Sequence, residues 1–412
     1  MQGTADSADR GSAKGAERSG NLDLRGIMRE AYLDNSATTR CFPEVARLMN
    51  KIYLEEYGNP SSMHHKGVEA EKQIIEARRA IAQILKVSDK NILFTSCGTE
   101  SDNIAIIGGA LANQRRGRHL ITTRIEHPAV LEAMKFLESL DFEVTYLPVD
   151  SKGIVSPEAV EEAVREDTIL VSVMHTNNEI GAVEPIREIA RRIKKKNPSV
   201  LFHVDAVQGF GKAKIFPKQW GIDLMAVSGH KIHAPKGIGF LYIGDRVKVK
   251  NLIFGGGQQN GMRSGTENVA GIAAMGLAAK MLYQNFDSEI EKLYGLRDLL
   301  ISEVSDLPDV YVNGPEGREG APHIISLTVP GVRAEVLLHA LEDKGVYVSS
   351  GSACATNRPH LSQTLEAIGL PREHMDNTIR ISLSSMNTEE DVHQASEAMH
   401  ELIPFLRKYT RH

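Results

Sequence analysis

The strongest constraint on the fold is an alternation of helix-like stretches and short apolar runs between about residues 65 and 280. Apolar side chains recur with helical spacing at 66–86, 99–113, 128–140, 157–165 and 185–196. Short apolar runs typical of buried strands lie at 92–94, 119–122, 143–147, 169–174, 200–204, 223–227 and 238–243. Strands and helices that alternate in this way form a mostly parallel sheet with helices on both faces. The sequence therefore predicts an α/β fold.

The remainder of the chain predicts a second, smaller domain. Residues 268–304 have the spacing of one or two long helices that leave the sheet, and the C-terminal part alternates strand, helix, strand, helix. A chain of 412 residues is also too long for one ordinary core. We expect a large domain over 41–285 and a smaller α/β domain made of 29–40 and 286–412. Residues 1–28, rich in Gly, Ala, Ser and mixed charges, are expected to form a disordered extension.

Composition excludes several classes of partner. The formal net charge of −5 argues against a nucleic acid or an anionic membrane, and no apolar run is long enough to span a bilayer. The three cysteines, Cys41, Cys97 and Cys354, show no paired spacing, which is typical of a reducing compartment. The histidines show no paired ligand spacing either. We therefore expect a cytoplasmic protein without disulfides and without a metal site.

Two of the short apolar runs end in side chains that suit one cofactor. Asp205 follows the run at 200–204 and Lys231 follows the run at 223–227, so each lies where a buried parallel strand ends. Ligands of open α/β sheets bind at that edge. Pyridoxal phosphate (PLP) needs a carboxylate beneath its ring nitrogen and a lysine that forms a Schiff base. Together the two residues predict a PLP site, whereas either alone is equally typical of an N-cap aspartate or a solvated lysine.

A separate stretch predicts a cradle for the phosphate group of PLP. Gly98 and Thr99 follow a predicted strand and open a helix, where backbone N–H groups and the helix dipole attract an anion. Ser228 and His230, next to the lysine, add hydrogen-bond donors. Gly and Thr at a helix start are also typical of plain capping, so this prediction depends on the strand-end pair.

Three further polar side chains follow predicted strands. His127 precedes Pro128 at a helix start and could stack on the pyridine ring and move protons, although capping histidines are common. Gln208 lies one helical turn after Asp205 and could reach the phenolic oxygen if a helix begins there. Asn178 ends another predicted strand and offers its amide to the cofactor or the substrate.

Cys354 and Arg380 are the candidate reactive groups of the second domain. Cys354 lies in 348–359, a small and polar stretch without apolar periodicity, so we expect an exposed loop. A structural cysteine lies among apolar neighbours, whereas an exposed thiol can enter a site as a nucleophile. Arg380 lies on a predicted strand and can bind a substrate carboxylate through two parallel hydrogen bonds, unless it forms only a surface salt bridge.

Taken together, these motifs resemble those of the PLP-dependent cysteine desulfurases, in the NifS- and IscS-like branch of the class V aminotransferases, over about residues 31–400. The motifs that carry the resemblance lie, in chain order, at 34–39, 58–62, 98–103, 126–127, 177–179, 203–208, 228–231, 261–266 and 349–354. Their number and order make chance a poor explanation. Cys97, where the family has a small residue such as Gly, departs from the pattern, and so does 357–361 in the loop after Cys354.

The resemblance implies a fold and a set of cofactor contacts. The fold is that of the PLP-dependent transferases of type I, like aspartate aminotransferase. Lys231 would hold PLP as a Schiff base and move the substrate α-proton, and His127 would stack on the ring and assist. The residues implied to contact PLP are Asp205, Gln208, His127, Asn178, Gly98, Thr99, Ser228 and His230. Thr266 would reach the phosphate of a neighbouring subunit, which implies a homodimer.

The resemblance also implies the reaction. Asn178, Arg380 and Asn35 would bind the substrate L-cysteine. Cys354 would attack its sulfur, carry it as a persulfide and leave L-alanine as the product. An acceptor protein, an iron–sulfur scaffold or a tRNA-thiolating enzyme, would then take the sulfur.

The residues leave other reactions open. Selenocysteine lyase or another PLP-dependent β-lyase would use the same ring-binding residues, and a plain aminotransferase would give Cys354 no role. An alternative of another class is a non-catalytic scaffold for iron–sulfur assembly, which has no chemical need for Asp205, Lys231 and Cys354 together. The identity of the sulfur acceptor depends on surfaces rather than on the site.

Overall fold

The central element of the fold is a sheet that the predicted strands build. The computed structural model describes residues 29–350 and 362–409, and within them seven strands pair in the order β2-β8-β7-β6-β5-β3-β4. The strands are β2 (Ile92–Thr95), β3 (His119–Thr123), β4 (Glu143–Leu147), β5 (Thr168–Ser172), β6 (Leu201–Asp205), β7 (Leu224–Ser228) and β8 (Gly239–Ile243). Of these seven, β8 runs in the direction opposite to that of the other six. The predicted mostly parallel sheet is therefore confirmed.

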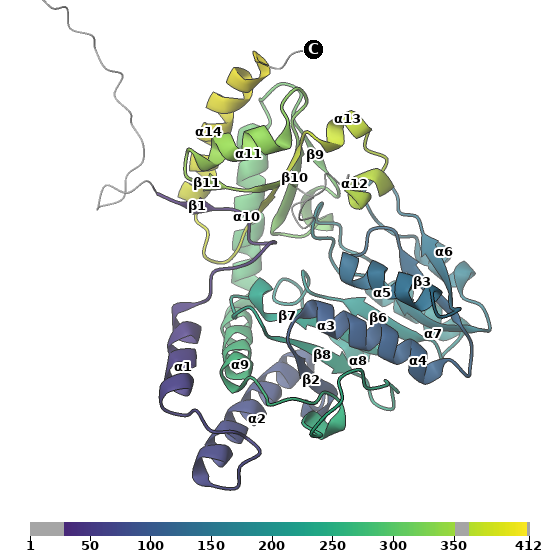
Figure 1. The fold of residues 1–412 in the computed structure, drawn as a ribbon. Coiled ribbons are helices and arrows are strands. Elements are labelled where there is room, and N and C mark those ends of the chain that lie inside the picture. Colours follow the sequence, from purple (N-terminus) through teal and green to yellow (C-terminus); the bar gives the residue numbers. More distant parts are fainter. Residues whose placement is uncertain (1–28, 351–361, 410–412) are drawn as a thin grey trace, which may run out of the picture.

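Helices cover both faces of this sheet (Figure 1). They are α1 (Pro43–Leu54), α2 (His65–Leu85), α3 (Gly98–Asn103), α4 (Gly109–Asn113), α5 (Pro128–Glu138), α6 (Pro157–Ala163), α7 (Ile186–Lys196), α8 (Pro217–Trp220) and α9 (Val269–Gln284). The helix expected at 99–113 is present, but a wider π-helical turn at Ile104–Gly108 joins α3 to α4. The other predicted helices of this region begin and end within a few residues of their expected bounds.

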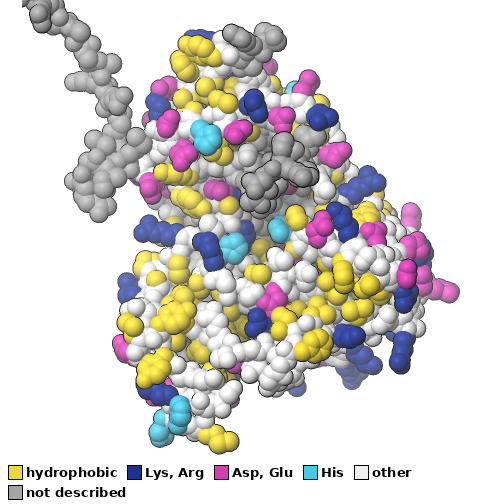
Figure 2. Space-filling model, in the orientation of Figure 1, with side chains coloured by type: hydrophobic (Ala, Val, Ile, Leu, Met, Phe, Trp, Pro, Cys, Tyr) yellow, Lys and Arg dark blue, Asp and Glu magenta, His cyan; other side chains and the backbone are white. Residues whose placement is uncertain are grey.

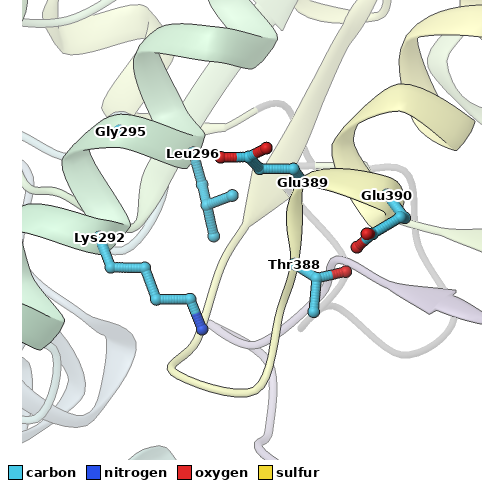
Figure 3. Close-up of a pocket in the computed structure, with 6 residues that line it drawn as sticks. All are labelled: Lys292, Gly295, Leu296, Thr388, Glu389 and Glu390. Carbon is cyan, nitrogen blue, oxygen red and sulfur yellow. The ribbon is translucent and has the colours of Figure 1, made fainter.

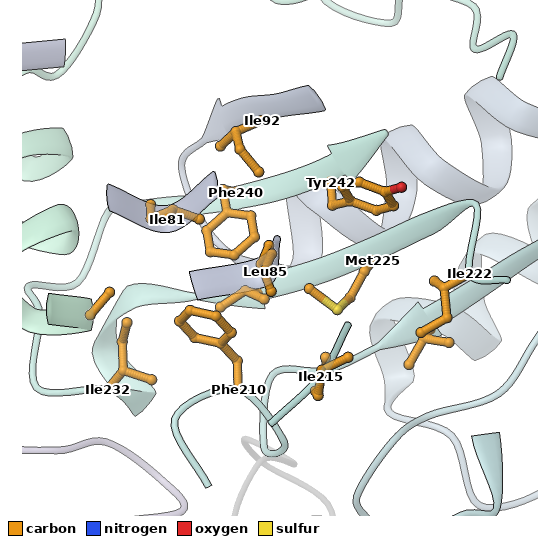
Figure 4. Packing of buried hydrophobic residues seen from close by; sticks show 14 of the residues in the cluster. Ile81, Leu85, Ile92, Phe210, Ile215, Ile222, Met225, Ile232, Phe240 and Tyr242 are labelled. Atoms are coloured by element: carbon orange, nitrogen blue, oxygen red, sulfur yellow. The ribbon is translucent and has the colours of Figure 1, made fainter. Parts of the chain in front are cut away.

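Alternate residues along a strand pack into two hydrophobic clusters, one on each face of the sheet. Leu224 of β7 packs in the cluster that α3, α4 and α5 cover, whereas the next residue, Met225, packs in the cluster that α2, α7 and α9 cover. Figure 4 shows part of the second cluster, where the rings of Phe210 and Phe240 meet edge to face at 5.3 Å. Because both faces are buried, these strands are continuous apolar runs in the sequence, which made them easy to locate.

The C-terminal part has a core of its own. Its helices are α10 (Phe286–Val304), α11 (Ala334–Glu342), α12 (Gln363–Ala367), α13 (Arg372–Met375) and α14 (Glu389–Arg407), and its strands are β9 (Tyr311–Asn313), β10 (Ile324–Thr328), β11 (Val346–Tyr347), β12 (Ser349–Ser350) and β13 (Thr378–Ser382). The strands pair antiparallel in the order β12-β13-β10-β9. Alternation of strands and helices does not fix strand direction, because intervening short elements can reverse the chain before it returns to the sheet.

The N-terminal segment joins the C-terminal core and then crosses to the sheet. β1 (Ala31–Tyr32) pairs with β11, and Leu33 is buried among the side chains of the C-terminal core. The chain then turns, and the N–H of Thr39 donates to the backbone oxygen of His230, just beyond β7. The separate cores support the division into 41–285 and 29–40 plus 286–412, which we retain as a proposal. The turn at 34–39 lies where the two parts meet.

Candidate active site

Asp205 and Lys231 lie at one edge of the sheet. Asp205 is the last residue of β6, and Lys231 lies three residues beyond the parallel neighbour β7, in a short 3-10 turn. The Lys231 ammonium group donates to the backbone oxygens of Ser36 and, at 2.8 Å, of Ala37. The lysine is half-buried and directed at the turn that joins the two parts of the chain. It is thus not a solvated loop residue.

The carboxyl group of Asp205 is buried, and its surroundings shift its pKa in opposite directions. Burial raises its pKa, while the charge of His127, a hydrogen bond from the N–H of Val207 and the charge of Lys231 each lower it. The bond to Val207, at 2.9 Å, closes a turn after β6. Asp205 therefore both caps this turn and interacts with the two other residues predicted to contact PLP.

Gln208 follows in that turn, and no helix begins there, contrary to the condition attached to its predicted role. The turn is closed when the N–H of Phe210 donates to the backbone oxygen of Ala206 at 2.8 Å. Gln208 is buried, its Nε2 donates to the oxygen of Ser36 at 3.0 Å, and its Oε1 accepts from His323 at 3.3 Å. These bonds fix the amide beside the 34–39 turn, and its contact with PLP stays a prediction.

His127 is the N-cap of α5, with Pro128 as the first helical residue. Its Nδ1 accepts a hydrogen bond from the N–H of Ala129 at 3.1 Å, so the proton of the neutral ring is on Nε2. Burial is the main cause that lowers its pKa, and the charges of Asp205 and Lys231 act in opposite directions. The capping role is therefore present, and it leaves Nε2 available to a ligand.

The predicted phosphate cradle has an open polar group. Ser228 Oγ is buried and has no hydrogen-bond partner among the described residues, and it lies beside Gly98, the first residue of α3. A Cβ atom on Gly98 would come within 2.7 Å of Val207 Cγ2. Thr99 is exposed, next to the first N–H groups of the helix. This hydroxyl and these helix N–H groups fit the phosphate group of PLP, which supplies acceptor oxygens.

His230 contributes a neutral ring. Its Nδ1 lies 3.3 Å from Thr38 Oγ1, and burial, followed by the charge of Lys231, lowers its pKa to about 4. An uncharged imidazole can donate one hydrogen bond to an anion but adds no positive charge. The predicted role of His230 at the phosphate is compatible with this position and stays a prediction.

Arg380 of β13 forms an ion pair, but a buried one. Its Nη2 donates to Asp34 Oδ1 at 2.8 Å, and its Nη1 donates to the backbone oxygen of Asn178 at 3.0 Å. Its Nε is buried and has no hydrogen-bond partner within residues 29–350 and 362–409. The guanidinium group is therefore held where the two parts of the molecule meet, beside Asn178, and substrate binding by this pair stays a prediction.

Asn35 lies in the same region and is largely committed to the fold. Its Nδ2 donates to the backbone oxygens of Tyr32 and Ser382 and to Asn387 Oδ1, at 2.9–3.1 Å. These bonds attach the N-terminal segment to β13. Contact between Asn35 and the substrate stays a prediction.

Sequence reasoning missed several residues that shape the site. Glu100 accepts hydrogen bonds from the backbone of Ser96 at 2.8 Å and from Arg263 at 2.7 Å. Burial would raise the pKa of Glu100, but the bonds from Arg263 and Ser96 outweigh it and lower the pKa. This ion pair links the predicted phosphate cradle to the segment that carries Thr266, which is exposed. A glutamate in the first turn of a helix gave no signal beyond favourable capping.

Lys212 was also missed, because a lone lysine after a glycine is typical of a surface. Its Nζ donates to the backbone oxygen of Lys231 at 2.5 Å. Burial, followed by the charge of Lys231, lowers the pKa of Lys212 to about 7. Two lysines therefore lie close together at this edge of the sheet.

Cys354 lies outside the described residues, but both flanks of its loop adjoin the site. Ser349 pairs with Arg380 in the register of β12 and β13. On the other flank, Ser362 Oγ donates to Glu179 Oε2 at 2.5 Å, next to Asn178. The chain therefore leaves and rejoins the described structure beside the predicted substrate-binding residues.

The surface away from the strand-end site holds other candidate binding features. Figure 2 shows positive and negative side chains interspersed over the visible face. A pocket of about 340 Å³ lies between α10 and the start of α14. Lys292, Glu389 and Glu390 are among its lining residues (Figure 3), none of which belongs to the strand-end site. Within the described part of the chain, no helix is long and apolar enough to cross a membrane.

Comparisons with known proteins agree with this geometry. The Aminotransferase class-V family model matches residues 31–395. The chain is 45% identical over 382 residues to the cysteine desulfurase IscS of Dictyoglomus turgidum, a match that covers 92% of this chain and 96% of that protein. A solved NifS-like protein is 40% identical, with a TM-score of 0.86 over 92% of this chain and 100% of that one. A structure titled SspA in complex with cysteine is 32% identical, with a TM-score of 0.75 over 87% and 100%.

The likeness to these structures confirms the predicted transferase fold of type I. The matches extend over nearly the whole chain and include the strand-end edge, the phosphate cradle and the region of Arg380. We conclude that the chain belongs to the class V aminotransferase family and, within it, to the cysteine desulfurases of the IscS and NifS type.

Proposed function

We propose that the protein is a PLP-dependent cysteine desulfurase that converts L-cysteine to L-alanine and transfers the sulfur to Cys354. The observation that carries this proposal is the mutual interaction of Asp205, His127 and Lys231 at the carboxyl edge of the sheet. The curated relative named cysteine desulfurase IscS and the structure titled as a complex with cysteine support the choice of reaction and substrate.

The pyridine ring and the phosphate group of the cofactor would be held by different residues. Asp205 would face the pyridine nitrogen, His127 would lie against the ring, and Ser228 and the N–H groups of α3 would bind the phosphate. When bound, PLP supplies an electron sink that stabilises negative charge at the substrate α-carbon. The unpartnered Ser228 hydroxyl, which lies beside Gly98 at the start of α3, supports this assignment.

The side chains of the chain perform the remaining steps. Arg380, with the Asn178 amide, would bind the substrate carboxylate and fix its orientation. Lys231 would hold and move the α-proton, because its flexible stem lets Nζ exchange the oxygens of Ser36 and Ala37 for a ligand. Nε2 of His127 would donate and recover a second proton.

Cys354 would complete the reaction. Its sulfur forms an S–S bond with the substrate sulfur while the Cβ–S bond breaks, and the carbon skeleton takes up a proton and leaves as alanine. No external oxidant or reductant is needed, since the oxidised sulfur is balanced by the reduced carbon. The positions of Ser349 and Ser362 beside Arg380 and Asn178 support this role.

We also propose that the protein is a homodimer that acts in the cytoplasm and passes sulfur to iron–sulfur assembly or tRNA thiolation. Several large apolar side chains of α1 and the segment before α2 are exposed, and they include Tyr53, Leu54, Tyr57 and Met63. Apolar groups gathered in one hairpin favour burial against a second copy. The exposed Thr266 is then free to approach the partner's phosphate site.

The test is product formation from L-cysteine by the purified protein in the presence of a thiol reductant. We expect alanine and sulfide in equal amounts, and neither from Lys231→Ala. L-Selenocysteine and an amino acid paired with a 2-oxo acid, assayed in parallel, distinguish a selenocysteine lyase and an aminotransferase. Turnover confined to either of those substrates would contradict the proposal.

A further inference from the structure

Beneath the strand-end site lies a second, fully buried acid–base pair. Asp102 of α3 and His203 of β6 are 1% and 0% exposed. Asp102 Oδ1 lies 3.4 Å from His203 Nε2. Apart from this contact, neither atom has a hydrogen-bond partner among the described residues. Two orphaned polar atoms that face each other in a dry interior must share a proton, because leaving both unpaired is costly.

The other ring nitrogen of His203 has a partner of its own. His203 Nδ1 lies 2.8 Å from Ser172 Oγ, on the neighbouring strand β5. Burial lowers the pKa of His203 to about 3, so its ring is neutral and carries one proton. The Ser172 hydroxyl can donate or accept, so two arrangements fit this contact. In the one where Nδ1 donates to Ser172, Nε2 is an acceptor and the proton of the contact belongs to Asp102.

The charges around Asp102 favour the same state. Burial raises the pKa of Asp102 well above its ordinary value, and the charges of Asp205, Glu126 and Cys97 raise it further. Asp205 in turn interacts with His127 and Lys231, which favour its ionised form. Two neighbouring carboxyl groups in one buried site do not both ionise.

We propose that Asp102 is a positioning residue that stays protonated and donates its hydrogen bond to His203, so that Asp205 alone carries the negative charge beneath the cofactor ring. This inference rests on the proposed function, because Asp205 has that role only toward PLP. His203 and Asp205 are two residues apart on β6 and so share one face of the strand. A second charge on Asp102 would compete for the same protons and weaken the hold of Asp205 on the ring nitrogen.

The first experiment uses the protein without cofactor and measures the midpoint of thermal unfolding between about pH 5 and 8.5. This range lies above the ordinary pKa of aspartate and ends at about the ordinary pKa of cysteine. Wild type is compared with Asp102→Asn, which keeps a donor but cannot ionise. A carboxyl group that must hold its proton in the fold but loses it on unfolding costs stability progressively as the pH rises. We expect the midpoint of Asp102→Asn to rise relative to wild type as the pH increases, and an exposed control, Asp298→Asn, to show no such trend. If the difference in unfolding midpoint between Asp102→Asn and wild type does not increase with pH in favour of the variant, the proposal is overturned.

The second experiment uses the protein loaded with PLP. Asp102→Ala leaves Nε2 of His203 without a donor, so we expect alanine formation to fall roughly tenfold. Asp102→Asn should recover most of that loss, and the pH at which the cofactor absorbance changes should stay as in wild type. Failure of the asparagine to rescue would show that the charge of Asp102 is needed and overturn the proposal. If wild type forms no alanine at all, the proposed function fails, while the cofactor-free measurement still decides the protonation of Asp102.

Discussion

At the scale of single residues, His127 serves the fold and the site through different atoms. Nδ1 accepts the N–H of Ala129 and caps α5, while Nε2 is left to the ligand. Burial lowers the pKa of the ring. Activity that depends on the neutral ring should therefore persist below the ordinary titration range of histidine and decline only at lower pH.

Replacing His127 by Asn separates these roles. Asn is a good N-cap, so we expect a loss of stability of less than about 0.5 kcal/mol, against about 1 kcal/mol for His127→Ala. Both variants lack a titrating ring, and we expect alanine formation to fall about 10²–10⁴-fold. Urea unfolding and product assays measure the two effects. If His127→Asn turned over as fast as wild type, the histidine would only cap the helix.

Residue types at strand ends were predictable, but their surroundings were not. Asp205, Lys231 and His127 were identified because each follows an apolar run that is buried on both faces. Asp102 and Lys212 gave no signal, because their burial depends on which elements pack over them. Only the folded chain shows that α3 covers β6 closely enough to bury a carboxyl group there.

At the scale of elements, the sequence specified the sheet better than the joints between its elements. The strands of the large sheet were located within a few residues, whereas the π-helical turn at Ile104–Gly108 and the tight turn after β6 were not foreseen. Both depend on side chains from distant segments. The antiparallel order around β13 was likewise hidden, since apolar alternation does not report strand direction.

The start of α3 predicts a contrast between two glycines. A methyl group at Gly98 would meet Val207 at 2.7 Å and Ser228 Cβ at 3.4 Å, in the proposed phosphate cradle. We expect Gly98→Ala to weaken PLP binding by about 1–3 kcal/mol, measured by titration of the cofactor-free protein.

Gly295 provides the matched control for that substitution. It lies within α10, and a Cβ atom added at that position would meet no other part of the described chain within 4 Å. Gly295→Ala should stabilise the protein by about 0.5–1 kcal/mol and leave PLP binding unchanged. Equal PLP affinity in both variants would contradict the cradle at Gly98.

At the scale of the whole molecule, Arg380 links the two parts of the chain through the backbone oxygen of Asn178, and Asp34 forms an ion pair with its guanidinium group. The pair is 5% and 20% exposed at the side chains, and its nitrogen and oxygen are 2.8 Å apart. Asp34 belongs to the segment that crosses from the C-terminal core to the large sheet, and Arg380 belongs to β13. Arg380, the predicted substrate-binding arginine, is therefore held by Asp34 within its own part and by the backbone of Asn178 in the other part.

Asp34→Asn should reveal the contribution of this ion pair. The change leaves a buried guanidinium group without its anion, and we expect a loss of stability of about 3 kcal/mol, measured by urea unfolding. Glu291→Gln removes the partner of Arg318 in an exposed ion pair and should change stability little. Similar small effects of both substitutions would mean that solvent, rather than Asp34, stabilises Arg380.

Whether Cys354 receives the sulfur of L-cysteine can be read from the mass of the intact protein after a single turnover. We predict that wild type and Cys97→Ala each gain one sulfur atom for every alanine released. Cys354→Ala should keep its PLP absorbance, gain no sulfur and release no alanine. If Cys354→Ala instead releases alanine as fast as wild type, or if the sulfur is found on another cysteine, Cys354 is not the sulfur acceptor.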